Sequence, residues 1–137
     1  MPVQTEAPYQ APTLLVVDDR QENLVAMEAL LENSAWQVRS AASGEAALRC
    51  LLENEVELVL LDVHLGSHHH GPDVYTELCQ RWGQTPAVIL VTAERDATLR
   101  RQAAESGWGF LAKPVRAPAL RALMSQTLLR LRESNTP

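Results

Sequence analysis

Short apolar runs alternate with helix-like segments along most of the chain. Five runs favour strands, and they cover residues 13–17, 37–41, 58–61, 87–91 and 110–112. The runs at 58–61 and 87–91 are apolar at every position, which is typical of parallel strands that are buried on both faces. The pattern therefore predicts a sheet whose central strands are covered from both sides.

Apolar residues between these runs recur at helical spacing. Leu24, Met27 and Leu31 form one such stripe, and Ser43 suits the N-cap position of the next helix because its hydroxyl can accept from a free backbone N–H. Five helices are expected: one that ends near residue 34, one that follows Ser43, one that begins at Pro72, and two that span 95–106 and 117–131.

The strict alternation of strand and helix implies right-handed crossovers and helices on both faces of a parallel sheet. At 137 residues we expect one α/β domain, a flavodoxin-like three-layer sandwich with five parallel strands in the order 2-1-3-4-5 and five helices. Residues 1–12 are expected to form a flexible leader, 13–131 the folded domain and 132–137 a C-terminal tail.

Charge and composition narrow the classes of partner. The formal net charge of -5 argues against nucleic acid and anionic membrane surfaces, which usually bind clusters of Lys and Arg, and leaves a basic or phosphorylated protein partner open. No apolar run approaches the roughly 20 residues of a membrane span, and no signal peptide is recognisable, so we expect a cytoplasmic protein. Cys50 and Cys79 are expected to be reduced, partly buried thiols rather than a disulfide or redox switch.

Polar residues follow four of the predicted strands at the point where each strand ends. They are Asp18, Asp19, Asp62, Thr92 and Lys113. Ligands of open α/β sheets bind outside the carboxyl ends of the strands, so these side chains are expected to meet in one crevice.

Three carboxylates in one crevice need positive charge nearby. Two carboxylates about 4 Å apart repel by roughly 4 kcal/mol at an effective dielectric constant near 20. Lys113 offsets one charge and leaves about two, which suits Mg²⁺, with Mn²⁺ able to substitute. Asp62 is then the best candidate nucleophile for phosphoryl transfer, and Thr92 and Lys113 would stabilise the transferred group.

This ordered set resembles the receiver domains of two-component response regulators, the CheY-like family, over residues 13 to about 130. The resemblance implies that Asp62 is the phosphoacceptor, that Asp19 binds the metal directly and that Asp18 acts partly through water. It also implies a metal ligand from the backbone carbonyl of His64. Thr92 matches the switch hydroxyl of the family.

Two further positions carry the resemblance along the fifth strand. Phe110 matches the switch aromatic, and the dipeptide Lys113-Pro114 matches the phosphate-contacting lysine with its family-typical cis proline. Simpler interpretations stay open. Asp18 or Thr92 could be a helix cap and nothing more, and Phe110 could be a packing residue and nothing more.

The sequence departs from the family pattern in two places. Residues 65–71 form an unusual loop about one residue longer than expected, and it contains His68, His69 and His70. Transition-metal binding, a solvated loop, and control of phosphatase access or kinase choice all stay open. Trp108 is bulkier than the residue that the family commonly has at this position. It is either a packing anchor or part of a partner surface.

The resemblance implies a phosphorylatable signalling domain rather than an enzyme, with autophosphorylation from small phosphodonors and slow autodephosphorylation. Its expected partners are a histidine kinase or phosphotransfer protein and a downstream effector or attached output domain. A homodimer through the last helix is also possible. Because the chain stops at Pro137, no output module is expected to follow, and the domain either stands alone or is excised from a larger regulator or hybrid kinase.

Two other functions are alternatives to a phosphoacceptor. A phosphorylation-independent docking or dimerisation module would not need the acidic set. A haloacid dehalogenase-type phosphatase would carry a DxDxT signature on the first strand. This chain instead has adjacent Asp18 and Asp19 there, and its best nucleophile is on the third strand.

Overall fold

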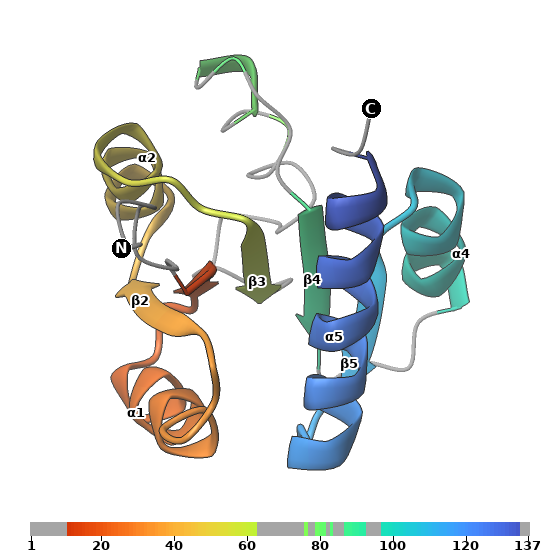
Figure 1. Ribbon diagram of the computed structural model, residues 1–137, viewed down its shortest axis with the longest axis horizontal. Coiled ribbons are helices and arrows are strands. Elements are labelled where there is room, and N and C mark those ends of the chain that lie inside the picture. The colour runs from red at the N-terminus through yellow and green to blue at the C-terminus, as the bar shows by residue number, and fades with distance from the viewer. Residues whose placement is uncertain are drawn as a thin grey trace, which may run out of the picture.

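The computed structural model of the chain describes residues 11–62, 76, 79–81, 83, 87–92 and 97–134 (Figure 1). Its centre is one sheet of five strands, all parallel, in the order β2-β1-β3-β4-β5. The strands are β1 (Thr13–Val17), β2 (Gln37–Ala41), β3 (Leu58–Asp62), β4 (Ala87–Thr92) and β5 (Gly109–Ala112). The predicted parallel sheet and its strand order are confirmed.

Helices lie on both faces of this sheet. Those with complete bounds are α1 (Gln21–Leu30), α2 (Gly44–Glu53), α4 (Ala97–Ser106) and α5 (Ala117–Ser134). Residues 76 and 79–81 are also helical, within the segment where the third helix was predicted, and the rest of that segment is outside the described residues. Among the helices described here, none has the length and apolar character needed to cross a membrane.

Alternation along the central strands divides the core into two layers, because consecutive side chains of a strand point to opposite faces. On one face Leu15 and Leu61 pack with α2 and with Leu99 of α4. On the other face Leu14 and Leu60 pack with residues of α1 and α5, and there the cluster includes Leu24, Leu120 and Met124. Figure 1 shows α1 and α2 towards the β2 edge and α4 and α5 towards the β5 edge. The result is the predicted three-layer sandwich.

Two helix ends follow directly from their cap residues. The Ser43 hydroxyl accepts a hydrogen bond of 3.1 Å from the Ala46 N–H, so the predicted N-cap of α2 is confirmed. Gly107 has a φ of +77° and follows the last residue of α4. The N–H of Trp108 donates to the Ala103 carbonyl at 2.8 Å, which is the 6→1 bond of a Schellman motif. Gly107 therefore stops α4, as predicted.

Other helix ends differ from the sequence expectation by a few residues. The first helix ends at Leu30 rather than near residue 34, because the N–H of Leu31 is shared between two carbonyls and tightens the last turn. Leu31 is still buried, so its place in the apolar stripe reports burial and not helical structure. The last helix continues past the predicted end at residue 131 to Ser134. Arg132 and Glu133 are exposed there, and exposed residues leave no apolar pattern to extend the prediction.

The start of β5 approaches β4 closely at a glycine. Gly109 pairs with Ile89, and a Cβ atom added at Gly109 would lie 2.8 Å from the Cγ1 atom of Ile89. Ile89 is fully buried and has little room to move. Only glycine therefore fits here without displacing the core, and the fit matters because β5 leads directly to Phe110 and Lys113.

We predict that Gly109→Ala lowers the free energy of unfolding by about 1–3 kcal/mol, the usual cost of overpacking a core. Urea denaturation monitored by circular dichroism measures the change. Ser106→Ala, at the exposed end of α4, is the control and should stay within about 0.5 kcal/mol of wild type. A Gly109→Ala protein as stable as that control would mean that Ile89 moves aside without cost.

Candidate functional site

The register of the sheet brings the ends of four strands to the same level. Val17 pairs with Leu61, so the next residues, Asp18 and Asp62, follow neighbouring rungs at the carboxyl edge. Asp62 in turn pairs with Val91 of β4, which immediately precedes Thr92. Thr92 pairs with Ala112 of β5, and Lys113 is the next residue. Strand pairing alone therefore collects the residues that the sequence places after separate strands.

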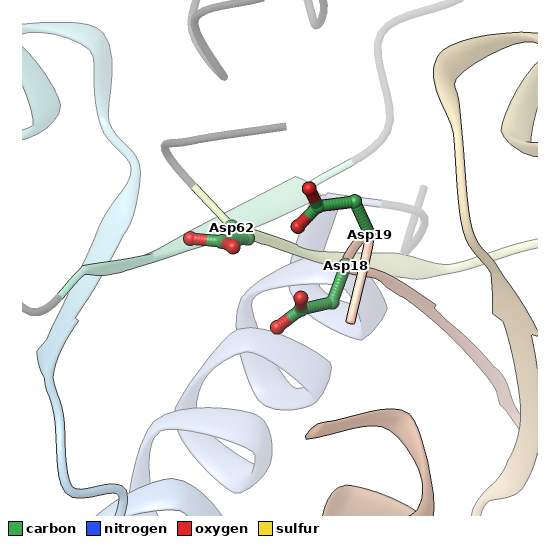
Figure 2. Close-up of side chains that lie close together, drawn as sticks. All are labelled: Asp18, Asp19 and Asp62. Carbon is green, nitrogen blue, oxygen red and sulfur yellow. The ribbon is translucent and has the colours of Figure 1, made fainter. Parts of the chain in front are cut away.

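The three aspartates form a compact acidic cluster (Figure 2). One carboxylate oxygen from each of Asp18, Asp19 and Asp62 lies within 4.8 Å of the others. Asp18 and Asp62 are only 6% and 7% exposed, whereas Asp19 is exposed. Burial weakens the screening of the first two charges by water, so their mutual repulsion is larger than it would be at the surface.

Lys113 supplies positive charge to this cluster. Its ammonium nitrogen lies 3.7 Å from Oδ1 of Asp62 and 3.9 Å from Oδ2 of Asp18. Three carboxylates and one ammonium leave a charge of about -2 on these four groups, as the sequence predicts. The N–H of Lys113 donates to the Thr92 carbonyl at 2.8 Å, and the peptide bond to Pro114 is cis, which the family resemblance implies.

Asp18 also accepts hydrogen bonds at the start of α1. Its Oδ1 atom accepts a hydrogen bond of 3.0 Å from the Arg20 N–H, and its Oδ2 atom accepts one of 3.1 Å from the side chain of Asn23. The N–H of Asp18 donates to the Ala41 carbonyl of β2. The carboxylate is therefore oriented by its surroundings, and it belongs to the acidic cluster as well as to the beginning of the helix. Sequence reasoning gave Asn23 no role.

Thr92 and Phe110 lie on the same side of the sheet. Phe110 pairs with Leu90, and both pack in the core layer beneath α4, so Thr92, two residues beyond Leu90, faces that layer as well. Thr92 is fully buried and is the last residue of β4. Phe110 is half-buried, with the guanidinium carbon of Arg100 5.1 Å from its ring centroid. Sequence reasoning did not identify this contact, which no local pattern signals.

A pocket of about 290 Å³ opens beside the acidic cluster, on the α1 and α5 side of the sheet. Asp18, Asn23, Asp62 and Lys113 contribute its polar wall, and apolar residues that include Met27 form the remainder. The pocket therefore borders the two buried carboxylates, and the exposed Asp19 provides the solvent-facing side of the cluster.

Several predicted site residues cannot be placed. His64 and the residues His68, His69 and His70 lie outside the described residues, so the predicted carbonyl ligand and the three readings of the histidine loop stay predictions. Trp108 is half-buried and packs against the core layer beneath α4, which fits the packing interpretation.

The two cysteines lie on the margin of the core layer beneath α2 and α4. Neither forms a disulfide and both are half-buried, as expected from the sequence. Burial raises the pKa of the Cys50 thiol, so it stays protonated at neutral pH and is a weak nucleophile. Within the described part of the chain, the nucleophile best placed for chemistry is thus a carboxylate of the acidic cluster.

This fold and site define a class of protein: a doubly wound α/β domain with an acidic, metal-competent crevice at the carboxyl edge of its sheet. Comparison with known proteins is more specific. The family model of the response regulator receiver domain matches residues 14–125. The chain belongs to the response regulator receiver domain family.

Relatives of two kinds match the chain. It is 34% identical over 128 residues to the transcriptional regulatory protein AfsQ1 of Streptomyces coelicolor, and the match covers 91% of this chain and 55% of AfsQ1. It is 29% identical over 123 residues to the aerobic respiration control sensor protein ArcB of Escherichia coli, covering 88% of this chain and 16% of ArcB. The chain thus spans about half of one relative and a small part of the other.

Solved structures agree with the fold. A signal receiver domain from Vibrio parahaemolyticus superimposes with a TM-score of 0.82 at 22% identity, covering 92% of this chain and 96% of that one. A response regulator receiver domain from Clostridium thermocellum gives a TM-score of 0.77 at 27% identity, with coverage of 88% and 97%.

We predict that Asp62→Asn stabilises the metal-free protein, because it removes one of two buried carboxylates that repel each other. The expected gain at low ionic strength is about 1–3 kcal/mol, reduced by the lost attraction to Lys113. Addition of Mg²⁺ at 100 times its dissociation constant should stabilise wild type by about 2.7 kcal/mol. The variant should gain less.

Urea denaturation in chelator and in Mg²⁺ measures both effects. Glu32→Gln removes an exposed carboxylate in the turn after α1 and serves as the charge-matched control, with neither effect expected. Equal Mg²⁺ stabilisation of wild type and Asp62→Asn would contradict a metal site at the cluster.

Proposed function

We propose that this chain is a phosphoacceptor that takes a phosphoryl group on Asp62 from a phosphohistidine of a histidine kinase or phosphotransfer protein. One observation carries the proposal: the Lys113 ammonium lies within ion-pair distance of both Asp62 and Asp18, beside the Asp19 carboxylate. Such an arrangement places a carboxylate nucleophile next to a cation and a divalent-metal ligand set, which phosphoryl transfer requires.

The donor set fits Mg²⁺. Carboxylate oxygens are the ligands that this hard cation prefers, and it keeps several waters, so a full cage of protein ligands is not needed. Asp18, Asp19 and Asp62 would hold it, together with the His64 carbonyl, and Mn²⁺ would substitute. When bound, the ion supplies positive charge that neutralises phosphoryl oxygens during transfer.

The transfer forms one bond and breaks one. A carboxylate oxygen of Asp62 forms a bond to phosphorus as the phosphorus–nitrogen bond of the donor breaks, and its electron pair returns to the imidazole. Lys113 stabilises charge on the transferred group, and the Thr92 hydroxyl donates to one of its oxygens. Water later hydrolyses the acyl phosphate, which restores the Asp62 carboxylate and releases inorganic phosphate.

Phosphorylation would change the face formed by α4, β5 and α5. Movement of Thr92 towards the phosphoryl group frees space on the side of the sheet that it shares with Phe110, and the ring turns into that space. The altered face then binds a downstream effector or an attached output domain, or a second copy of the chain through α5. We place the domain in the cytoplasm, where it meets its phosphodonor.

The similarity to AfsQ1 and ArcB supports this reading, since one is described as a transcriptional regulator and the other as a sensor protein. A docking module that works without phosphorylation is the alternative. Such a module gains nothing from burying Asp18 and Asp62 against each other, and that burial costs free energy. The acidic cluster therefore favours the phosphoacceptor.

We predict one labile phosphoryl adduct on the intact protein after incubation with acetyl phosphate and Mg²⁺. Intact-mass spectrometry detects it, and hydroxylamine, which cleaves acyl phosphates, should remove it. Asp62→Asn and a chelated sample are the controls and should carry no adduct. An adduct that persists in Asp62→Asn would assign the phosphoryl group to another residue and defeat the proposal.

We also predict that Lys113→Ala slows adduct formation by about 10²-fold, because it removes a preorganised donor to the transferring group. The comparison is Arg116→Gln, which removes an exposed positive charge three residues away and should leave the rate within about twofold of wild type. If both variants slow equally, the general positive potential of this loop matters, and Lys113 has no specific role.

A further inference from the structure

A contact between α4 and β5 links two residues with no shared role in the phosphoryl chemistry. Arg100, in the first turn of α4, places its guanidinium carbon 5.1 Å from the centroid of the Phe110 ring. At this distance a cation is attracted to the negative face of the ring. Arg100 itself is exposed to solvent, whereas Phe110 is half-buried at the margin of the core.

The pair lies next to the core layer in which the Phe110 ring would turn. Phe110 is in the core layer that Thr92 faces, one strand away, and only residues 93–96 separate Thr92 from the helix that carries Arg100. Leu99 and Ala103, which flank Arg100 on the inner side of α4, are buried in the same layer as Phe110. A ring that turns inward along this layer must leave the guanidinium behind.

We propose that Arg100 is a positioning residue that holds Phe110 in its half-buried position beside α4 and so sets how much phosphoryl binding energy is needed to turn the switch. This inference rests on the proposed function, since it assumes that the ring moves when Asp62 is phosphorylated. It adds a residue outside the phosphorylation site that opposes activation.

The chemistry of arginine suits this task. Its guanidinium is planar and weakly hydrated, so it stacks on an aromatic face at small cost in lost hydration, and its charge persists at every physiological pH. An exposed cation–π contact changes an equilibrium by roughly two- to fivefold. A group that opposes the inward ring weakens the binding of a phosphoryl group by up to the same factor, because the two equilibria are linked.

The composition of the chain provides a direct probe. Phe110 is the single phenylalanine among the 137 residues, so the full chain labelled with 4-fluorophenylalanine has one ¹⁹F resonance. Titration with beryllofluoride in Mg²⁺, a stable analogue of the phosphoryl group, should shift this resonance from one position to another. The half-saturating beryllofluoride concentration measures the affinity, and its difference between variants reports the change in the cost of turning the ring.

We expect Arg100→Gln to lower that concentration by two- to fivefold. Arg101→Gln removes the same charge from the next residue, which is also exposed, and should match wild type. Arg100→Lys keeps the charge without the planar stack and should fall between wild type and Arg100→Gln. A mere loss of stability or of positive potential would weaken the binding of the anionic analogue, so tighter binding separates the proposed role from both.

Two results would overturn the inference. If the wild-type resonance responds but Arg100→Gln titrates at the same or a higher concentration, Arg100 does not oppose the switch. If no chain responds, the ring does not move and the inference also fails. The acetyl phosphate assay then separates the two proposals: an adduct on Asp62 leaves the phosphoacceptor intact, and the absence of an adduct defeats it as well.

Discussion

Parallel pairing of β1, β3, β4 and β5 places the last residue of each strand at one edge of the sheet. Val17 is level with Leu61, Asp62 with Val91, and Thr92 with Ala112, so segments far apart in the sequence end within one rung of each other. A shift of this register by one residue would exchange the side chains between the two core layers, so packing of both layers against the helices favours the observed register. The geometry of the acidic cluster is thus a consequence of core packing.

The cluster itself opposes the stability of the fold. Two of its carboxylates are nearly inaccessible to water, and one ammonium compensates three negative charges. An apolar replacement would be easier to bury, so the charge is retained at the expense of stability. A divalent cation removes this conflict, which makes the folding free energy of the domain sensitive to the metal that the proposed chemistry uses.

The free energy needed to turn the switch proposed for Thr92 and Phe110 can be compared with that of the contact between Arg100 and Phe110. A two-state equilibrium needs about 5.5 kcal/mol to move from 1:99 to 99:1. The contact between Arg100 and Phe110 is worth about 0.5–1 kcal/mol, so it adjusts the set point of the switch and does not provide its driving force. Under this proposal, a residue on the outer side of α4 tunes the response of this chain without any change in the acidic cluster.

Local patterns in the sequence predicted the strands, several helix ends and the identity of the polar residues at the strand ends. Apolar periodicity located β1 and β2 to the residue, and Ser43 and Gly107 marked the beginning of α2 and the end of α4. These features depend on neighbours within a few positions, which is why they can be read from one chain. The predicted helix ends were wrong where a buried residue is not helical, as at Leu31, and where helical residues are exposed, as beyond residue 131.

Only the tertiary structure decided distances between segments. The separations of Lys113 from Asp18 and Asp62, the hydrogen bond from Asn23 to Asp18 and the stack of Arg100 on Phe110 each join residues from different elements. Side-chain composition gives no signal for such pairs, because the partner depends on strand register and on the rotation of each helix about its axis. The chemistry was therefore legible in the residue types, whereas its geometry arose from the packing of the whole domain.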